Sequence, residues 1–288
     1  MIDFIQNTLD GLTAGASYAL LGVGFTLIFG VLRRANLSYG PAIMFGAYLA
    51  TWASFSFKGL LLLAAIAVAG TVLAGVYVER LCFAPHRRGP AAAAMVASFA
   101  IWMQLEEFAT LLLPRHLYAF PALYEGGPLN FGPFFVRVES LLILLAAVAT
   151  CIAGWGILYA TRFGIAVRAV IDDPRAAELS GINVGSVSLR VFAAASAIGG
   201  LTGFLIVASH EQVTPMLGMW STLKGMLAMM LGGLGSLPGA IAGGLALGLI
   251  EAHSQWYLGP QFRDFIAYLL LFALLAARPR WMNTRSAY

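Results

Sequence analysis

The chain is a succession of apolar stretches that are nearly free of charged residues and are separated by short polar or glycine-rich segments. Several stretches are about 20 residues long, the length that a helix needs to cross the apolar core of a bilayer. Only 10% of the residues are charged, whereas a soluble domain has about 25%. We therefore predict an all-α, polytopic helical membrane protein.

We expect one transmembrane domain over residues 1–288 with about eight transmembrane segments, because the loops are too short to form a separate soluble domain. Two segments, 41–54 and 220–231, are too short to cross comfortably. Such segments can mark a transport pathway or an internal repeat, but two tilted or partly embedded ordinary helices explain them equally well. The apolar segments are 12–32, 41–54, 60–78, 91–113, 140–160, 189–209, 220–231, 239–253 and 265–277.

A polar segment, 161–188, interrupts the apolar pattern and carries the signals that begin and end a short helix. Asp173 can cap the N-terminus, and Pro174 suits the first helical position, where no N–H is needed. The acidic Asp172 and Asp173 would lie at the positive end of the helix dipole. Gly181 supplies the left-handed residue that ends the helix.

This predicted helix has about two turns, and so short a helix is marginal in water on its own. We expect it to rest on other parts of the chain, next to a second possible helix with Phe163, Val167 and Val170 on one side. A capped polar helix between membrane segments is suited to docking another protein. An ordered loop without a partner would show the same pattern.

The same segment resembles a known family, and other motifs support the resemblance. The chain resembles the LivH-type permease subunits of branched-chain amino acid ABC importers over nearly its whole length. The motifs are TRFG at 161–164, RA at 168–169, DDP at 172–174, AA at 176–177, Leu179, GINV at 181–184, GASYAL at 15–20, GFTLIFG at 24–30 and GGLGSLPG at 232–239.

In that family, the segment that 161–188 resembles is the cytoplasmic coupling loop, which contacts the ATPase subunit. The resemblance thus implies a permease subunit that passes a small polar solute inward. Its expected partners are a second, LivM-like permease subunit, two cytoplasmic ATPase subunits and an extracytoplasmic solute-binding protein. The predicted ATPase-docking residues are Arg168, Asp172, Asp173, Pro174, Arg175, Glu178 and Gly181.

The basic residues predict how the chain lies in the cell inner membrane, since they favour the cytoplasmic side. With the N-terminus outside and the C-terminus inside, the inner segments hold 12 of the 17 Lys and Arg residues. The net charge of +4 follows from this asymmetry and does not indicate a nucleic-acid partner. The inner residues are Arg33, Arg34, Arg80, Arg87, Arg88, Arg162, Arg168, Arg175, Arg190, Arg278, Arg280 and Arg285.

No catalytic or nucleotide-binding motif stands out. The chain has two lysines, Lys58 and Lys224, and neither belongs to a GxxxxGK[ST] phosphate-binding loop. We therefore expect no enzyme activity and no bound cofactor, with ATP used by the partner subunits. A metal site is not indicated, because the histidines and cysteines are scattered: His86, His116, His210, His253, Cys82 and Cys151.

A few polar residues within the apolar segments are candidates for a transport pathway, because ionisable groups in membranes usually face protein or water. Lys224 and a glutamate would make a strut or gate if they pair, but exposure near the outer boundary fits equally well. The glutamates in question are Glu106, Glu107 and Glu251. The pathway candidates are Ser17, Tyr18, Asn36, Ser38, Tyr39 and Lys224, and helix packing explains them equally well.

Glycines at four-residue spacing predict closely packed helices. Packing within the chain and contact with a second permease subunit are both consistent with this spacing. The pairs are Gly11 with Gly15, Gly235 with Gly239, Gly239 with Gly243, and Gly244 with Gly248.

Two other functions remain open at this point. A secondary transporter or channel would work without an ATPase, but it would need a coupling-ion site, and carboxylates within the apolar segments are few. The importer family also includes permeases associated with urea and short amides, and no residue in this sequence selects among the solutes.

Overall fold

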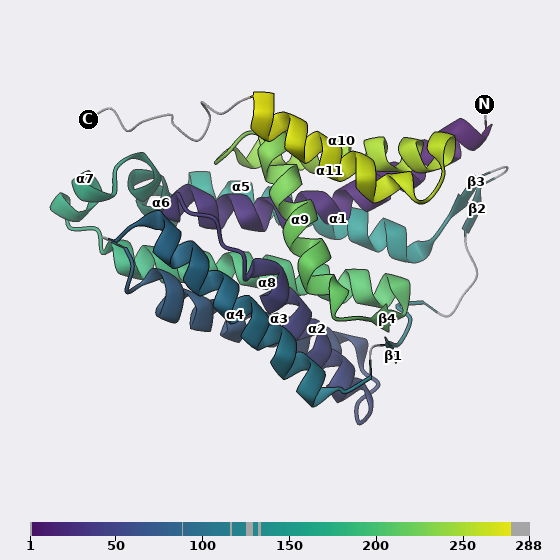
Figure 1. The fold of residues 1–288 in the computed structure, drawn as a ribbon, viewed down its shortest axis with the longest axis horizontal. Helices are drawn as coiled ribbons and strands as arrows, with labels where there is room; N and C mark the ends of the chain where they lie inside the picture. Colours follow the sequence, from purple (N-terminus) through teal and green to yellow (C-terminus); the bar gives the residue numbers. More distant parts are fainter. Residues whose placement is uncertain (1, 88, 116, 125–128, 132–133, 278–288) are drawn as a thin grey trace.

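The computed structural model describes residues 2–87, 89–115, 117–124, 129–131 and 134–277. Most of its helices run along the long axis of the molecule and pack side by side (Figure 1). This confirms the prediction of a polytopic helical protein. The helices are α1 Ile2–Leu32, α2 Tyr39–Ser54, α3 Leu60–Val78, η1 Glu79–Phe83, α4 Ala91–Leu112, α5 Val138–Ala160, α6 Arg162–Asp172, α7 Pro174–Leu179, α8 Val184–His210, α9 Met216–Gly232, α10 Leu237–Leu258 and α11 Phe262–Ala277.

The two ends of the bundle differ in structure. At one end, β1 (Tyr118–Ala119) pairs antiparallel with β4 (Gln212–Val213), and β2 (Leu129–Phe131) pairs with β3 (Phe134–Val136). The first residues of α1 also lie there, whereas α6 and α7 lie at the opposite end (Figure 1). We call these the β-strand end and the α7 end.

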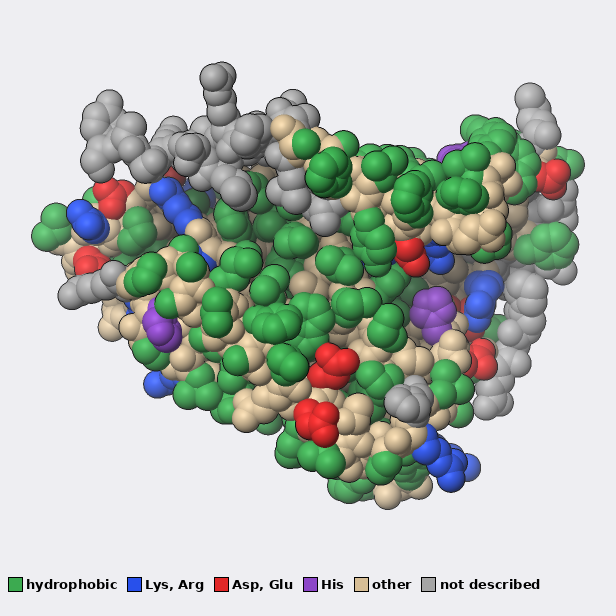
Figure 2. Space-filling view, viewed as in Figure 1, with side chains coloured by type: hydrophobic (Ala, Val, Ile, Leu, Met, Phe, Trp, Pro, Cys, Tyr) green, Lys and Arg blue, Asp and Glu red, His purple; other side chains and the backbone are tan. Residues whose placement is uncertain are grey.

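The two ends also divide the basic residues as the sequence predicted. The described arginines that were assigned to the inner side all lie on segments at the α7 end, while Arg137, whose guanidinium donates to the Ser209 carbonyl, lies at the β-strand end. Arg88, Arg278, Arg280 and Arg285 lie outside the described residues. Figure 2 shows a largely hydrophobic face whose charged side chains gather mainly towards the two ends.

Within the described residues, five helices are long and apolar enough to cross a membrane, and the bent pair α9–α10 would add a sixth. Helices α2 and α11 have 16 residues each, about 24 Å of helix, which is less than the roughly 30 Å of an apolar bilayer core. The expected short and interrupted segments are therefore present. Helix α1 begins ten residues before the predicted 12–32, because its polar first turns continue the helix beyond the apolar run.

Helix α9 crosses the bundle obliquely (Figure 1). Its 17 residues span about 26 Å, and the chain changes direction by 117° between α9 and α10. Consequently α9 advances only about 12 Å along the axis of α10. Gly233 and Gly235 in the connection have φ angles of 97° and 83°, a conformation that glycine adopts without strain.

Helices α1 and α10 pack closely through small residues. A Cβ atom added to Gly11 would lie 2.9 Å from the Cβ of Ala252, and one added to Gly15 would lie 2.8 Å from the Cα of Leu245. Gly248 faces the backbone of Gly15 in the same contact. Packing within the chain therefore accounts for these glycines, as one of the two interpretations of their spacing predicted.

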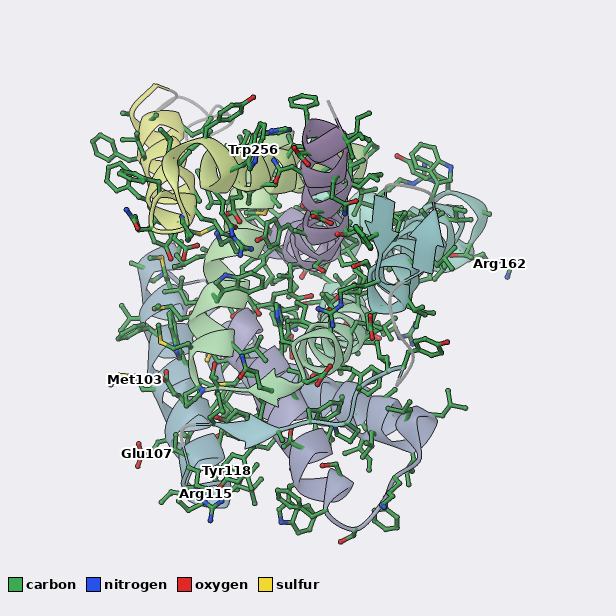
Figure 3. All side chains as sticks on the ribbon, turned by 90° about the vertical axis from the view of Figure 1, so that its right-hand side faces the viewer. Met103, Glu107, Arg115, Tyr118, Arg162 and Trp256 are labelled. Carbon is green, nitrogen blue, oxygen red and sulfur yellow. The ribbon has the colours of Figure 1, made fainter. Side chains whose placement is uncertain are left out.

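Helices α4 and α5 lie at the outside of the bundle and expose apolar side chains, whereas most of α1 is buried. Met103 on α4 is 61% exposed, and its side chain points away from the neighbouring helices, as does that of Glu107 (Figure 3). An apolar surface of this kind fits contact with lipid.

Replacing Gly248 by Ala should destabilise the protein by about 1–3 kcal/mol, since the new methyl group would overlap the backbone of α1. For a chain of this size, we expect a fall in Tm of roughly 2–12 °C. Gly154→Ala on α5 is the matched control, because a Cβ there meets nothing within 4 Å. Thermal unfolding of both variants in detergent measures the difference, and equal Tm values would contradict the packing.

Candidate functional site

The local sequence defines both ends of α7. The carboxylate of Asp173 accepts hydrogen bonds from the N–H groups of Arg175 at 2.8 Å and Ala176 at 3.2 Å, and Pro174 is the first helical residue. At the other end Gly181 has a φ of 83°, and the Ile182 N–H donates to the Ala177 carbonyl, as in a Schellman motif. The predicted start and end of this helix are confirmed.

One prediction about the acidic pair is wrong. Asp172 is the last residue of α6 and so lies at the negative end of that helix, not in the first turn of α7. Asp173 has an extended backbone, with φ −149° and ψ 108°, and it ends α6 and begins α7 at the same time. Only Asp173 therefore benefits from the positive end of the α7 dipole.

Helix α6 holds α7 against the bundle. Val167 and Val170 are buried, and Phe163 packs against the same cluster, as the sequence predicted. Ala177 of α7 is 3% exposed within that cluster. The short helix thus rests on apolar side chains of α6 and α8, which stabilise it.

The opposite face of α7 points away from the protein. Leu179, the last residue of the helix, is 91% exposed. Arg175 and Glu178 beside it are also exposed. Arg168 lies elsewhere, with its guanidinium 4.9 Å from the ring centre of Tyr159 on α5. The face that could contact a partner is therefore made by α7, while Arg168 lies beside α5.

A second group of polar residues surrounds a charged pair inside the bundle, and we call it the buried ion cluster: Tyr18, Lys224, Glu251, Arg263 and Asp264. Tyr18, Lys224 and Glu251 are buried, whereas Arg263 is partly exposed and Asp264 is exposed. Lys224 is fully buried, forms an ion pair with Glu251 and lies 2.9 Å from a carboxylate oxygen of Asp264. The guanidinium of Arg263 contacts Glu251 at 3.1 Å. The cluster joins α9, α10 and α11.

The hydroxyl of Tyr18 connects this cluster to α1. It donates to Glu251 at 2.7 Å and accepts from Arg263 at 2.8 Å. Two positive and two negative side chains therefore balance one another in the cluster. The pairing supports the strut or gate interpretation of Lys224, and exposure near the outer boundary does not describe Lys224 or Glu251. Glu107, in contrast, is exposed.

The sequence did not indicate Arg263 and Asp264, because they fall between two predicted membrane segments and look like loop residues. The signal that could have found them is that charged residues within apolar segments need partners of opposite charge. An interior pair of Lys224 with a glutamate was one of the two interpretations of the sequence, and a basic and an acidic residue stand together at the start of the next apolar segment.

An open pocket of about 410 Å³ lies beside the cluster, between α1, α10 and the start of α11. Asn7, Asp10, Glu251, Trp256 and Arg263 are among its lining residues, and Figure 3 shows Trp256 beside α1. Across the described part of the chain, no group of three or more His, Cys, Asp or Glu side chains is arranged to hold a metal ion.

The residues predicted to line a pathway fall into separate groups. Tyr18 and Lys224 belong to the buried ion cluster. Asn36 accepts from the N–H of Ser38 at 3.0 Å, and the Ser38 hydroxyl donates to the carbonyl of Ser98. Ser17 is also buried. None of the pathway candidates is among the residues that line the open pocket, and the bonds of Asn36 and Ser38 agree with the helix-packing interpretation.

Helix α2 begins in the interior of the bundle. The hydroxyl of Tyr39, its first residue, donates to the carbonyl of Ala195 in the middle of α8 at 2.9 Å. The Tyr39 ring also contacts Phe25 of α1, with 4.8 Å between ring centres. The segment before it, which includes Asn36 and Ser38, therefore enters the protein from the α7 end as non-helical chain.

The family follows from a comparison of sequences. The sequence model of the branched-chain amino acid transport system permease component family matches residues 7–275. The chain belongs to this family. The resemblance that the motifs indicated is thereby confirmed, and the family's members are permease subunits, not enzymes.

Individual relatives agree with this assignment. The permease LivH of Escherichia coli K12, from a high-affinity branched-chain amino acid transport system, is 29% identical over 96% of this chain and 94% of its own. BraD of Pseudomonas aeruginosa is equally similar. A putative metal-chelate type ABC transporter in an inward-facing conformation has a related fold, with a TM-score of 0.55, 14% identity, and coverage of 95% of this chain and 85% of its own.

Replacing Lys224 by Met should destabilise the protein by about 3–5 kcal/mol, because Glu251 would lose one of its two cationic partners in a buried site. Lys58→Met is the matched control, since Lys58 is the other lysine of the chain and is exposed. Thermal unfolding in detergent tests the difference. If both variants unfold at the wild-type temperature, the ion cluster does not hold the helices together.

Proposed function

We propose that this chain is the membrane-spanning permease subunit of an ATP-driven importer and that α7 is the surface that its ATPase subunits contact. The cargo is a branched-chain amino acid or another small polar solute. Family membership supports the transport function, and the structure of α7 supports the docking role.

The observation that carries the docking role is the form of α7. Both ends are capped, one face is anchored on α6 and α8, and the exposed face presents Leu179 beside Arg175 and Glu178. Apolar side chains surrounded by polar groups are typical of the centres of protein interfaces. A rigid helix of this kind can transmit a push from an ATPase without melting.

We propose seven membrane crossings instead of the eight that the sequence suggested. Ends on opposite sides of a membrane require an odd number of crossings. The five long helices with α2 and α11 make seven, and the oblique α9 together with α10 forms a pair that enters and leaves on one side. The arginines at the α7 end support a cytoplasmic position for that end, and in this arrangement α1 begins outside and α11 ends inside.

Family membership supports the remaining partners of the proposed complex. ATP is used by two separate cytoplasmic subunits, a second, LivM-like permease subunit completes the pathway, and an extracytoplasmic protein delivers the solute. The complex lies in the cell inner membrane. Closure of the ATPases pushes on α7 and rocks the helices between outward-open and inward-open states.

An ATPase-independent secondary transporter is the less favoured function. Such a protein needs a carboxylate that can bind and release a coupling ion. Glu251 is the buried carboxylate closest to that description, but it is paired with both Lys224 and Arg263. A carboxylate held by two cations is poorly suited to releasing and accepting an ion.

Replacing Leu179 by Asp should weaken ATPase binding, because a charge would enter the apolar centre of the contact. Loss of a central contact residue typically costs about 2 kcal/mol or more, which is roughly a 30-fold loss of affinity. Leu179→Met is the control that retains apolar contact. Co-purification of the ATPase with the permease measures binding, and equal recovery with both variants would contradict the docking surface.

The joint change Asp173→Lys and Glu178→Lys should separate ATP hydrolysis from uptake while the chain still inserts into the membrane. Asp173→Asn is the control for the helix cap, since Asn caps as well as Asp. Uptake of labelled leucine, valine and urea by proteoliposomes that contain the whole complex reports on coupling and on the solute class together. Unchanged uptake by the double variant would count against α7 as the coupling element.

A further inference from the structure

Two consecutive arginines directly after α1 reach in different directions at the α7 end. One nitrogen of the Arg33 guanidinium donates to the carbonyls of Ile171 at 2.6 Å and Asp172 at 3.1 Å. These are the last two residues of α6, whose carbonyls lack partners within the helix. Arg33 therefore binds the chain immediately before α7.

Arg34 binds a different segment, the turn that leads from η1 to α4. Both terminal nitrogens of its guanidinium take part. One donates to the carbonyl of His86, and the other donates to those of Arg87 at 3.1 Å and Gly89 at 2.7 Å. Arg33 has a φ of 51°, an uncommon conformation for a residue other than glycine. The backbone is thus held in an unfavoured shape at the residue where the two side chains diverge.

The turn that Arg34 binds also contacts the chain after α7, through side chains other than Arg34. The guanidinium of Arg87 pairs with Glu79 of η1 and lies 3.4 Å from the carbonyl of Gly185, in the first turn of α8. The hydroxyl of Ser188 donates to the same carboxylate at 3.3 Å. The segments on both sides of α7 are therefore linked, through Arg33 and through Arg87, to the Arg33–Arg34 pair.

From Arg34 the chain passes directly to the buried start of α2. Four residues separate Arg34 from Tyr39. Within them, Asn36 and Ser38 are buried and hydrogen bonded to the chain around them, including the carbonyl of Ser98 on α4. Only a short, hydrogen-bonded segment therefore separates the Arg33–Arg34 pair from the first residue of α2 in the interior of the bundle.

We propose that Arg33 and Arg34 are positioning residues that transmit movement of α7 to the start of α2. Arg33 ties α6, and with it α7, to the end of α1. Arg34 connects the end of α1 to the η1–α4 turn. Through both contacts, the end of α1 and the start of α2 move together with α6 and α7. This inference rests on the proposed role of α7 as the ATPase contact and adds the route by which that contact acts.

The test uses the whole complex in proteoliposomes and measures labelled leucine and urea taken up per ATP hydrolysed. Arg33→Ala and Arg34→Ala should each lower this ratio by at least about fivefold, the lower end of typical coupling between sites. ATPase binding should persist, since neither side chain belongs to the exposed face of α7. Arg80→Ala is the matched control, because Arg80 is an exposed arginine at the same end, on η1.

The conservative variants make the test specific. Arg33→Lys should retain the ratio, because a single nitrogen makes both contacts of Arg33 and an ammonium can replace it. Arg34→Lys should behave like Arg34→Ala, because two nitrogens share three carbonyls. Arg33→Gly suits the left-handed backbone, so it keeps the fold while removing the contact, and it should behave like Arg33→Ala.

Three results would overturn the proposal. The first is a ratio for Arg33→Gly and Arg34→Ala equal to that of Arg80→Ala. The second is loss of ATPase binding in these variants, which would mean that the arginines shape the docking surface and do not transmit its movement. The third is a wild-type complex that binds no ATPase or carries neither solute, in which case the proposed function fails and this inference fails with it.

Discussion

An unpaired charge is costly in an apolar interior, and the arrangement of this chain follows from that cost. On the face in Figure 2 most charged side chains lie towards the two ends of the bundle, although two acidic groups lie between them, and Lys224 and Glu251 in the interior are paired. The pair fixes the oblique α9 to α10, and Arg263 and Tyr18 extend the connection to α11 and α1. These contacts join α1, α9, α10 and α11, whereas the proposed ATPase contact lies at the α7 end.

The α7 end is built from hydrogen bonds to backbone carbonyls and from capped helix ends. Asp173 and Gly181 define a helix of six residues, and the arginines after α1 bind the segments around it. Side chains that bind backbone carbonyls hold whole elements in place. A push on α7 can therefore displace α6, the start of α8 and the chain before α2 together, without unfolding any of them.

Features that depend on neighbouring residues were predictable from the sequence. The start and end of α7, its anchoring face on α6 and the apolar helices all follow from local spacing, and the motifs indicated the family. Features that depend on distant contacts were not predictable. The oblique course of α9, the partners Arg263 and Asp264, and the exposure of Leu179 arise only when helices far apart in the sequence pack together. The ends of the apolar runs also did not predict the ends of the helices well, since α1 begins in polar residues before its apolar run.

The central claim is that α7 faces the cytoplasm, and labelling of Arg175→Cys tests it most directly. The variant is made in a chain without Cys82 and Cys151 and is expressed without the ATPase, with Lys58→Cys at the opposite end as the control. A membrane-impermeant maleimide should label Arg175→Cys only in inside-out vesicles and Lys58→Cys only in intact cells. Labelling of Arg175→Cys from outside intact cells would contradict the account.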